Sequence, residues 1–111
     1  MSVTSKRVVA KILEDAETTQ YTAGAGVRAI IDKCTATNYS GSSATLSISL
    51  VTSGASAGDA YLVVKDKSLA AGETYTFPEI VGHTLNSGDF ISTNPSAATS
   101  VNMRVTVREN T

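Results

Sequence analysis

The chain has 111 residues, which is enough for one domain and leaves no room for a second. Nine basic and ten acidic residues give a formal net charge of -1, so nothing in the composition suggests nucleic acid or an anionic membrane as a partner. Only 5% of the residues are aromatic and tryptophan is absent, so we expect a core of Val, Ile, Leu and Ala.

The N-terminal part and the cysteine content indicate where the chain is made. Cys34 is the only cysteine, so the chain forms no intramolecular disulfide. Lys11 interrupts the short apolar patch at residues 8–10 before a signal-peptide core can develop. We therefore expect a protein made in the cytoplasm, with no membrane partner.

Residues 1–20 allow two interpretations. Val8, Val9, Ile12 and Leu13 recur at helical spacing, whereas Val8, Ala10 and Ile12 also alternate as in a strand. We favour a first strand or an extended arm that lies outside the regular sandwich and is ordered by a neighbouring subunit. The acidic stretch at residues 14–19 reads as an exposed loop.

From Tyr21 onward the pattern is that of short strands and turns. Residues 27–38 and 44–51 are predicted strands, joined as a long hairpin by the turn formers at 39–43. Further strands are predicted at residues 61–64, 74–77 and 90–93. In the last strand, Met103, Val105 and Val107 alternate with Arg104, Thr106 and Arg108, so the two arginines point outward.

Two copies of one turn signature support the all-β assignment. Leu69-Ala70-Ala71-Gly72-Glu73 and Leu85-Asn86-Ser87-Gly88-Asp89 each precede alternating aromatic and β-branched residues. We predict an all-β fold of seven or eight strands without a helix: a single antiparallel β-sandwich or jelly roll with an N-terminal arm. The sandwich domain spans residues 21–111, and residues 1–20 form the arm or first strand.

The residues that carry chemistry are sparse. His83 is the only histidine and no nucleophile is marked near it, and one His with one Cys does not make a structural zinc site. Asp59, Glu73 and Asp89 follow glycines in turns, but their spacing matches no calcium loop, and local backbone hydrogen bonding is the simpler interpretation. We expect no catalytic, cofactor or metal site, no small-molecule substrate and no enzymatic activity.

A glycan-binding module is an alternative of a different class. Tyr39, in a predicted turn, is the one aromatic side chain expected to lie exposed as a stacking platform. A single ring is a weak signal, because binding pockets combine several converging groups.

The chain resembles small β-sandwich structural proteins of tailed bacteriophages and prophages, over about residues 18 to 109. The segments that carry the resemblance are Thr19 to Ala23, Ala29 to Lys33, Thr37-Asn38, Ala44 to Ser47, Leu69 to Thr74, Gly82 to Leu85 and Gly88 to Ser92. Where that family usually has a proline, this chain has Ala23-Gly24-Ala25-Gly26.

The resemblance implies a virion structural protein that binds other virion proteins. It favours a head decoration or cement protein on the major capsid protein, located in the virion and assembled as a homo-oligomer. The alternatives are a neck, tail or fibre-attachment protein, or a glycan-binding host-attachment module. We predict that the protein interface uses the N-terminal segment and the outward arginines of the last strand: Lys6, Arg7, Val8, Val9, Lys11, Ile12, Leu13, Arg104 and Arg108.

Overall fold

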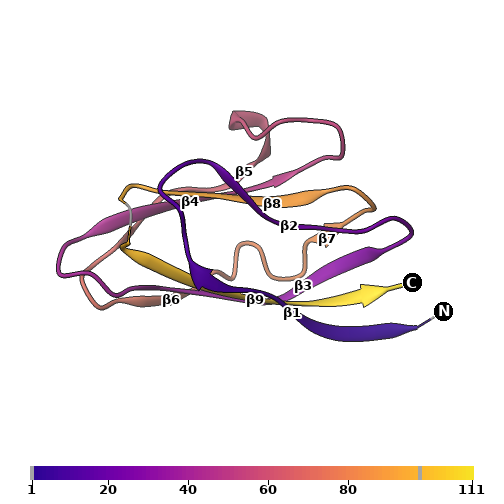
Figure 1. Cartoon of the computed structure of the whole chain (residues 1–111), viewed down its shortest axis with the longest axis horizontal. Helices are drawn as coiled ribbons and strands as arrows, with labels where there is room; N and C mark the ends of the chain where they lie inside the picture. Colours follow the sequence, from indigo (N-terminus) through magenta and orange to yellow (C-terminus); the bar gives the residue numbers. More distant parts are fainter. Residues whose placement is uncertain (1, 98) are drawn as a thin grey trace.

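Two antiparallel β-sheets packed face to face form the computed structural model, which describes residues 2–97 and 99–111 (Figure 1). The first sheet has the order β1-β9-β3-β6, with β7 also paired to β3. The second sheet has the order β2-β8-β4-β5. The elements are β1 (Val3–Ile12), β2 (Thr18–Thr22), β3 (Arg28–Asn38), β4 (Ala44–Val51), η1 (Asp59–Tyr61), β5 (Leu62–Leu69), β6 (Thr74–Thr76), β7 (Thr84–Leu85), β8 (Phe90–Pro95) and β9 (Val101–Asn110).

The space between the two sheets holds one hydrophobic core. Strands with one buried face place alternate side chains inward, and β9 does so without interruption from Val101 to Val107. The core is mostly aliphatic, as the composition predicts, with Phe77 and Met103 as larger members. Other fully buried side chains are Leu13, Ile31, Leu46, Ile48, Leu69, Ile80, Leu85 and Ile91.

The all-β prediction and most strand positions are confirmed, but one connection differs. The predicted hairpin of residues 27–38 and 44–51 is wrong, because β3 lies in the first sheet and β4 in the second. Asn38 explains the change of sheet. Its buried amide Nδ2 donates to the carbonyls of Ser42 and Leu69, and its Oδ1 accepts from Ser40, so the turn is tied to the end of β5.

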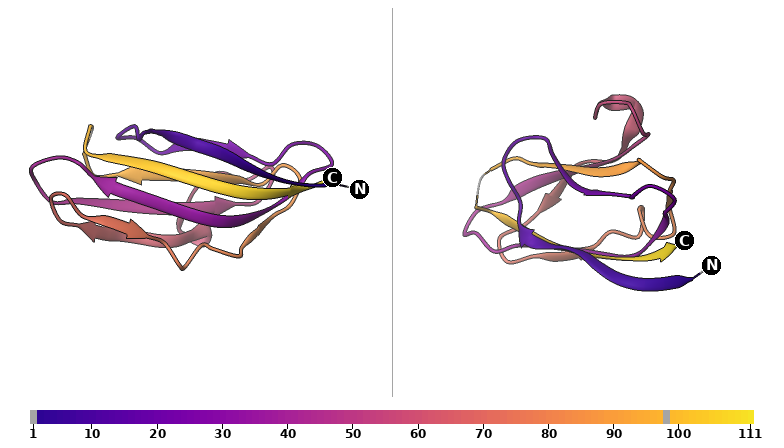
Figure 2. Two further views of the ribbon diagram at one scale, coloured as in Figure 1. Left: turned by 90° about the horizontal axis from the view of Figure 1, so that it is seen from below. Right: turned by 45° about the vertical axis from the view of Figure 1, so that its right-hand side comes forward.

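The N-terminal segment is an edge strand of the first sheet. β1 pairs with β9 along its whole length, from Val3 opposite Asn110 to Ile12 opposite Asn102 (Figure 2). Val9 and Leu13 are buried in the core. The expectation that these residues lie outside the sandwich is therefore corrected: residues 3–12 form the edge of the first sheet, because their backbone pairs with β9 and Val9 contributes to the core.

Both signature turns have the same local construction. Gly72 and Gly88 adopt positive φ angles of 78° and 88°, a conformation that favours glycine. The carboxylates that follow, Glu73 and Asp89, accept the backbone N–H of Ala70 and Asn86 respectively. These acids therefore close their own turns, which is the simpler of the two interpretations that the sequence left open.

Helical structure is limited to the single short turn η1 within the residues described. No helix in that part of the chain has the length and apolar character needed to cross a membrane.

Candidate functional site

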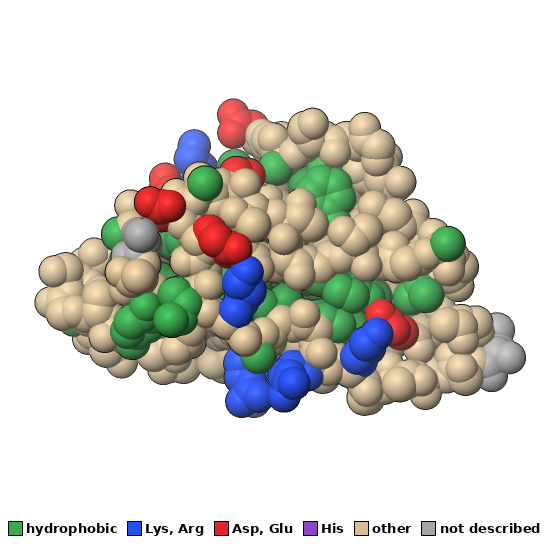
Figure 3. Space-filling view, viewed as in Figure 1, with side chains coloured by type: hydrophobic (Ala, Val, Ile, Leu, Met, Phe, Trp, Pro, Cys, Tyr) green, Lys and Arg blue, Asp and Glu red, His purple; other side chains and the backbone are tan. Residues whose placement is uncertain are grey.

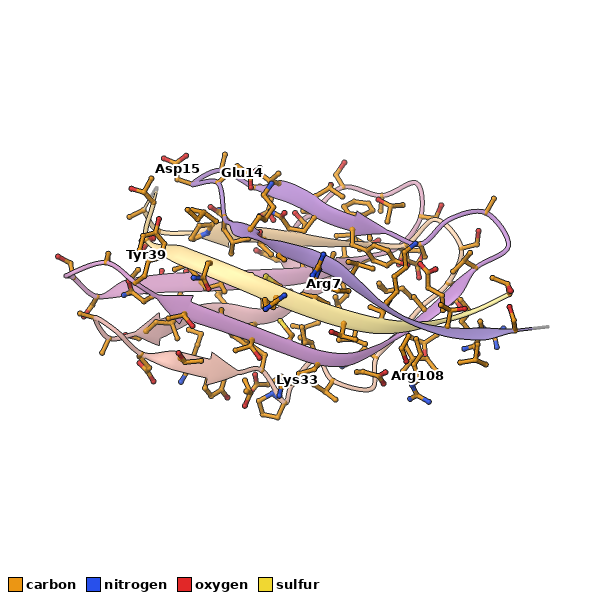
Figure 4. All side chains as sticks on the ribbon, turned by 60° about the horizontal axis from the view of Figure 1, so that its bottom comes forward. Arg7, Glu14, Asp15, Lys33, Tyr39 and Arg108 are labelled. Atoms are coloured by element: carbon orange, nitrogen blue, oxygen red, sulfur yellow. The ribbon has the colours of Figure 1, made fainter. Side chains whose placement is uncertain are left out.

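A groove with basic walls lies on the outer face of the first sheet. It is lined by Arg7 on β1, Thr106 and Arg104 on β9, and Lys33 and Thr35 on β3, and its volume is about 470 Å³. Figure 4 views this face and labels Arg7 and Lys33, which come from strands on either side of β9. The side chains that form the groove thus come from three adjacent strands of one sheet.

Two β-bulges bring the cations together. Arg7 and Lys33 are both paired with Thr106, one from each side of β9. The register of β1 shifts between Arg7 and Val9, and that of β3 shifts between Ile31 and Lys33. A bulge adds one residue and reverses the alternation that follows it. Arg7 and Lys33 therefore point outward although Val9 and Ile31, two residues away, are buried.

The groove cations lack acidic partners. Within residues 2–97 and 99–111, no carboxylate lies within ion-pair distance of Arg7, Lys33 or Arg104. Arg108, the next outward residue of β9, differs because its Nε is 2.7 Å from Oδ1 of Asp32. Lys and Arg side chains gather along the lower margin in Figure 3, where the first sheet lies, so this face carries local positive charge in a chain of net charge -1.

The inward cations of β1 are neutralised at the open edge between the sheets. Lys11 Nζ donates to Glu14 Oε2 at 2.7 Å, and Gln20 on β2 donates to Glu14 Oε1 at 3.1 Å. These hydrogen bonds lower the pKa of Glu14 to about 2, with Lys11 as the larger cause.

A second polar link lies farther along the same edge. The Tyr21 hydroxyl donates to Glu109 Oε2, and Lys6 Nζ lies 3.6 Å from Glu109 Oε1. Burial, and then the hydrogen bond to Glu109, raise the pKa of Tyr21. Because Tyr21 is on β2 and Glu109 is on β9, the link joins the two sheets.

The structure separates the predicted interface residues into three groups. Arg7 and Arg104 meet in the groove, and Arg108 and the exposed Ile12 lie on the same outer face. Lys6 and Lys11 form intramolecular ion pairs instead.

Three apolar members of the prediction are less available to a partner. Val9 and Leu13 are 4% and 2% exposed, which removes them from any surface contact in this fold, and Val8 is half-buried. Sequence reasoning did not assign Lys33, Thr35 or Thr106 to the interface, and Lys33 is the one cation among them. Only the bulge at Asp32 turns it outward, and nothing in the local sequence marks that bulge.

All four sheet edges carry features that oppose pairing with another strand. β1, β2 and β5 each show a register shift against the neighbouring strand, and β6 has only three residues. Bulges and short edge strands discourage edge-to-edge association. The edges of the sheets are therefore poorly suited to pairing with a further strand.

The other candidate residues do not form a second site of comparable construction. His83 is exposed and lines a hollow of about 290 Å³ with Tyr61 and Asp89, but both Asp89 oxygens already accept backbone N–H groups, from Ser53 and Asn86. Burial raises the pKa of the Cys34 thiol to about 12. Tyr39 is 44% exposed, as predicted.

Possible metal ligands are dispersed over the described part of the chain. No group of three or more His, Cys, Asp or Glu side chains lies there in an arrangement that could hold a metal ion. Comparison with known proteins adds no identity: neither family models, nor curated proteins, nor solved structures give a match to this chain.

Proposed function

We propose that the chain is a non-enzymatic virion structural protein that docks on another virion protein through the outer face of the first sheet. The observation that carries this proposal is the groove of Arg7, Lys33 and Arg104, whose cations have no acidic partner among the described residues. A partner that supplies carboxylates would neutralise them. The resemblance to phage structural proteins favours the major capsid protein as that partner and a decoration or cement role on the head.

We also propose that the sandwich is a jelly roll. A jelly roll has eight main strands in two sheets and can be derived by rolling up one long antiparallel ribbon. The pairs β1 with β9, β2 with β8, β3 with β6 and β4 with β5 are nested in this way along the chain and support the assignment. Viral capsid domains and lectins both have this architecture. The fold therefore does not distinguish these functions, and the choice between them depends on the site.

Within this proposal the N-terminal segment contributes through its outward residues. Arg7 lines the groove, and Ile12 is 52% exposed at the end of β1, beside Ala10, Asn102 and Arg104. The predicted arm thus becomes an edge strand that presents one cation and one apolar side chain to the partner. Several copies per particle, arranged with the symmetry of the shell, are part of the proposal.

The test is deletion of the gene from the phage or prophage that carries it, followed by complementation. We expect mass spectrometry to find the wild-type chain in purified particles. Particles from the deletion strain should be less resistant to heat. Complementation with the Arg7→Glu, Arg104→Glu variant should leave particles unoccupied, whereas the Lys65→Glu control, on the opposite sheet, should restore occupancy. A chain absent from wild-type particles would refute the proposal.

The alternatives give different results in the same preparation. Electron cryomicroscopy of the particles would place a decoration protein over the shell and a neck, tail or fibre-attachment protein at the tail. The glycan-binding alternative rests on Tyr39 and predicts hits on a glycan array that the Tyr39→Ala variant loses.

A further inference from the structure

We propose that the groove binds an extended segment of a partner protein that carries acidic residues at two alternate positions, acidic-x-acidic. This inference deepens the proposed function and rests on it for the kind of partner. The groove supplies two guanidinium groups, one ammonium group and two threonine hydroxyls, from Arg7, Arg104, Lys33, Thr35 and Thr106. All five can donate hydrogen bonds, and carboxylates are the acceptors that such groups bind best in proteins.

The first argument is the clustering of like charge. Side chains directly or diagonally opposite on adjacent strands interact, and like charges there destabilise a sheet. Arg7 and Lys33 flank Thr106, and Arg104 occupies the next outward position of β9. Elsewhere in the same sheet, cations are neutralised by carboxylates of the chain itself, as in the pairs Lys6–Glu109 and Arg108–Asp32. The groove cations are the exception. An arrangement that costs stability and is built from two bulges is typical of a functional surface.

The second argument is spacing. Outward residues of β9 recur every second position, about 6.8 Å apart for an antiparallel strand. Carboxylates two residues apart in an extended segment have about the same separation. A segment lying along β9 therefore places one carboxylate between Arg7 and Lys33, over Thr106, and the next over Arg104 and Thr35. Adjacent carboxylates would point to opposite sides of the segment and reach only one of these positions.

The third argument concerns the occupant. The protected edges argue against a partner that adds a strand to a sheet and favour one that lies across the face. A second copy is the competing occupant, since Asp15-Ala16-Glu17 has the acidic-x-acidic pattern. Glu17 of this pattern is already engaged, however, because it accepts a hydrogen bond from the hydroxyl of Ser92. Glu14, which directly precedes the pattern, is engaged by Lys11 and Gln20. A separate acidic protein therefore fits the groove better.

The experiment uses the whole chain and two synthetic peptides of identical composition, acetyl-Thr-Glu-Thr-Glu-Thr-amide and acetyl-Thr-Glu-Glu-Thr-Thr-amide. Binding is followed by nitrogen-15 NMR at low ionic strength. We expect the alternating peptide to shift the amides of Arg7, Lys33, Thr35, Arg104 and Thr106 and to bind several-fold more tightly than its isomer. The Arg7→Gln, Arg104→Gln variant should lose these shifts, and the Lys65→Gln control should keep them.

Several results would overturn the proposal. The proposal is wrong if the two peptides bind equally, if the shifted amides lie elsewhere, or if no amide shifts at millimolar peptide. These three results come from the wild-type chain alone, so they hold even where a variant misfolds. Salt-sensitive self-association that the Arg7→Gln, Arg104→Gln variant abolishes would assign the groove to a second copy. Tighter binding of a heparin fragment at the same amides would assign it to a polyanionic glycan. Peptide binding by a chain that is absent from virions would refute the proposed function alone.

Discussion

The cationic side chains on the two sides of β1 differ in whether they have an acidic partner. On the inward side, Lys6 and Lys11 form ion pairs with Glu109 and Glu14, and the same two carboxylates accept hydrogen bonds from Tyr21 and Gln20 of the other sheet. On the outward side, Arg7 lies near Lys33 and Arg104, and none of the three has a carboxylate within ion-pair distance among the described residues. One strand thus contains two cations that are paired within the chain and one cation that is not. The difference teaches that pairing, rather than charge alone, separates structural from candidate binding residues.

The largest effect is expected where the inward side of this segment enters the core. Leu13→Ala should lower the free energy of unfolding by about 2–5 kcal/mol, because Leu13 is 2% exposed and the surrounding side chains fill a lost volume only in part. The control is its neighbour Ile12→Ala, which should cost about 0.5 kcal/mol or less because Ile12 is on the surface. Urea denaturation measures both, and similar losses for the two variants would contradict the assigned faces.

A smaller effect is expected at the link between the sheets. Glu109→Ala should destabilise the fold by about 1–3 kcal/mol, since it leaves the half-buried Tyr21 hydroxyl without its acceptor. Combining Glu109→Ala with Tyr21→Phe should cost less than the sum of the two single changes, because both remove the same hydrogen bond. Strict additivity in this double-mutant cycle would show that the link contributes nothing.

The Lys11–Glu14–Gln20 cluster should respond to acid. The pKa of Glu14 is lowered from 4.5 to about 2, so its contribution to stability is present above pH 4.5 and is lost as the pH falls toward 2. The wild-type chain should therefore melt above the Glu14→Gln variant near neutral pH, and the difference should shrink over that acidic range. Thermal melts of both proteins at matched salt measure it, and a difference that grows on acidification would contradict the assignment.

The smallest effect is expected on the outward side, and its sign is reversed. Arg7→Gln, Lys33→Gln or Arg104→Gln should leave stability unchanged or raise it by about 0.5 kcal/mol or less, because each removes like-charge repulsion from an exposed face. Added salt should erase the gain, since it screens exposed charges. A clear loss of stability in these variants would place the groove cations with the structural pairs of the inward side.

The sequence predicts the strands of regular alternation well. Residues 44–51 match β4, and Arg104 and Arg108 point outward as expected, because β9 keeps period two through both. The order of the strands within the two sheets was harder to predict from the sequence. Turn formers at 39–43 suit a hairpin and a crossing between sheets equally. The contacts that distinguish the two are distant in sequence: Asn38 donates to the carbonyl of Leu69, thirty-one residues away, and β3 pairs with β9.

The groove could be predicted only in part, for a related reason. Arg104 was found from its alternation and Arg7 from its place in the N-terminal segment, but Lys33 was not found. A strictly alternating strand that buries Ile31 would bury Lys33 as well. The extra residue at Asp32 reverses this, and the reversal depends on the register with β9, which no short stretch of sequence determines.

The central position of β9 in the first sheet also bears on how the chain folds during synthesis. β9 lies between β1 and β3. The residues of β1 therefore have no hydrogen-bonding partner in the sheet until residues 101–110 have been synthesised. Such distant pairing is slow to form, because a long loop must close before any contact offsets the lost entropy. A nascent chain on the ribosome therefore exposes β1 and β3 without their shared neighbour. The sheet can close only after the C-terminal strand has left the exit tunnel, so ribosome-bound intermediates truncated before residue 101 should remain sensitive to protease.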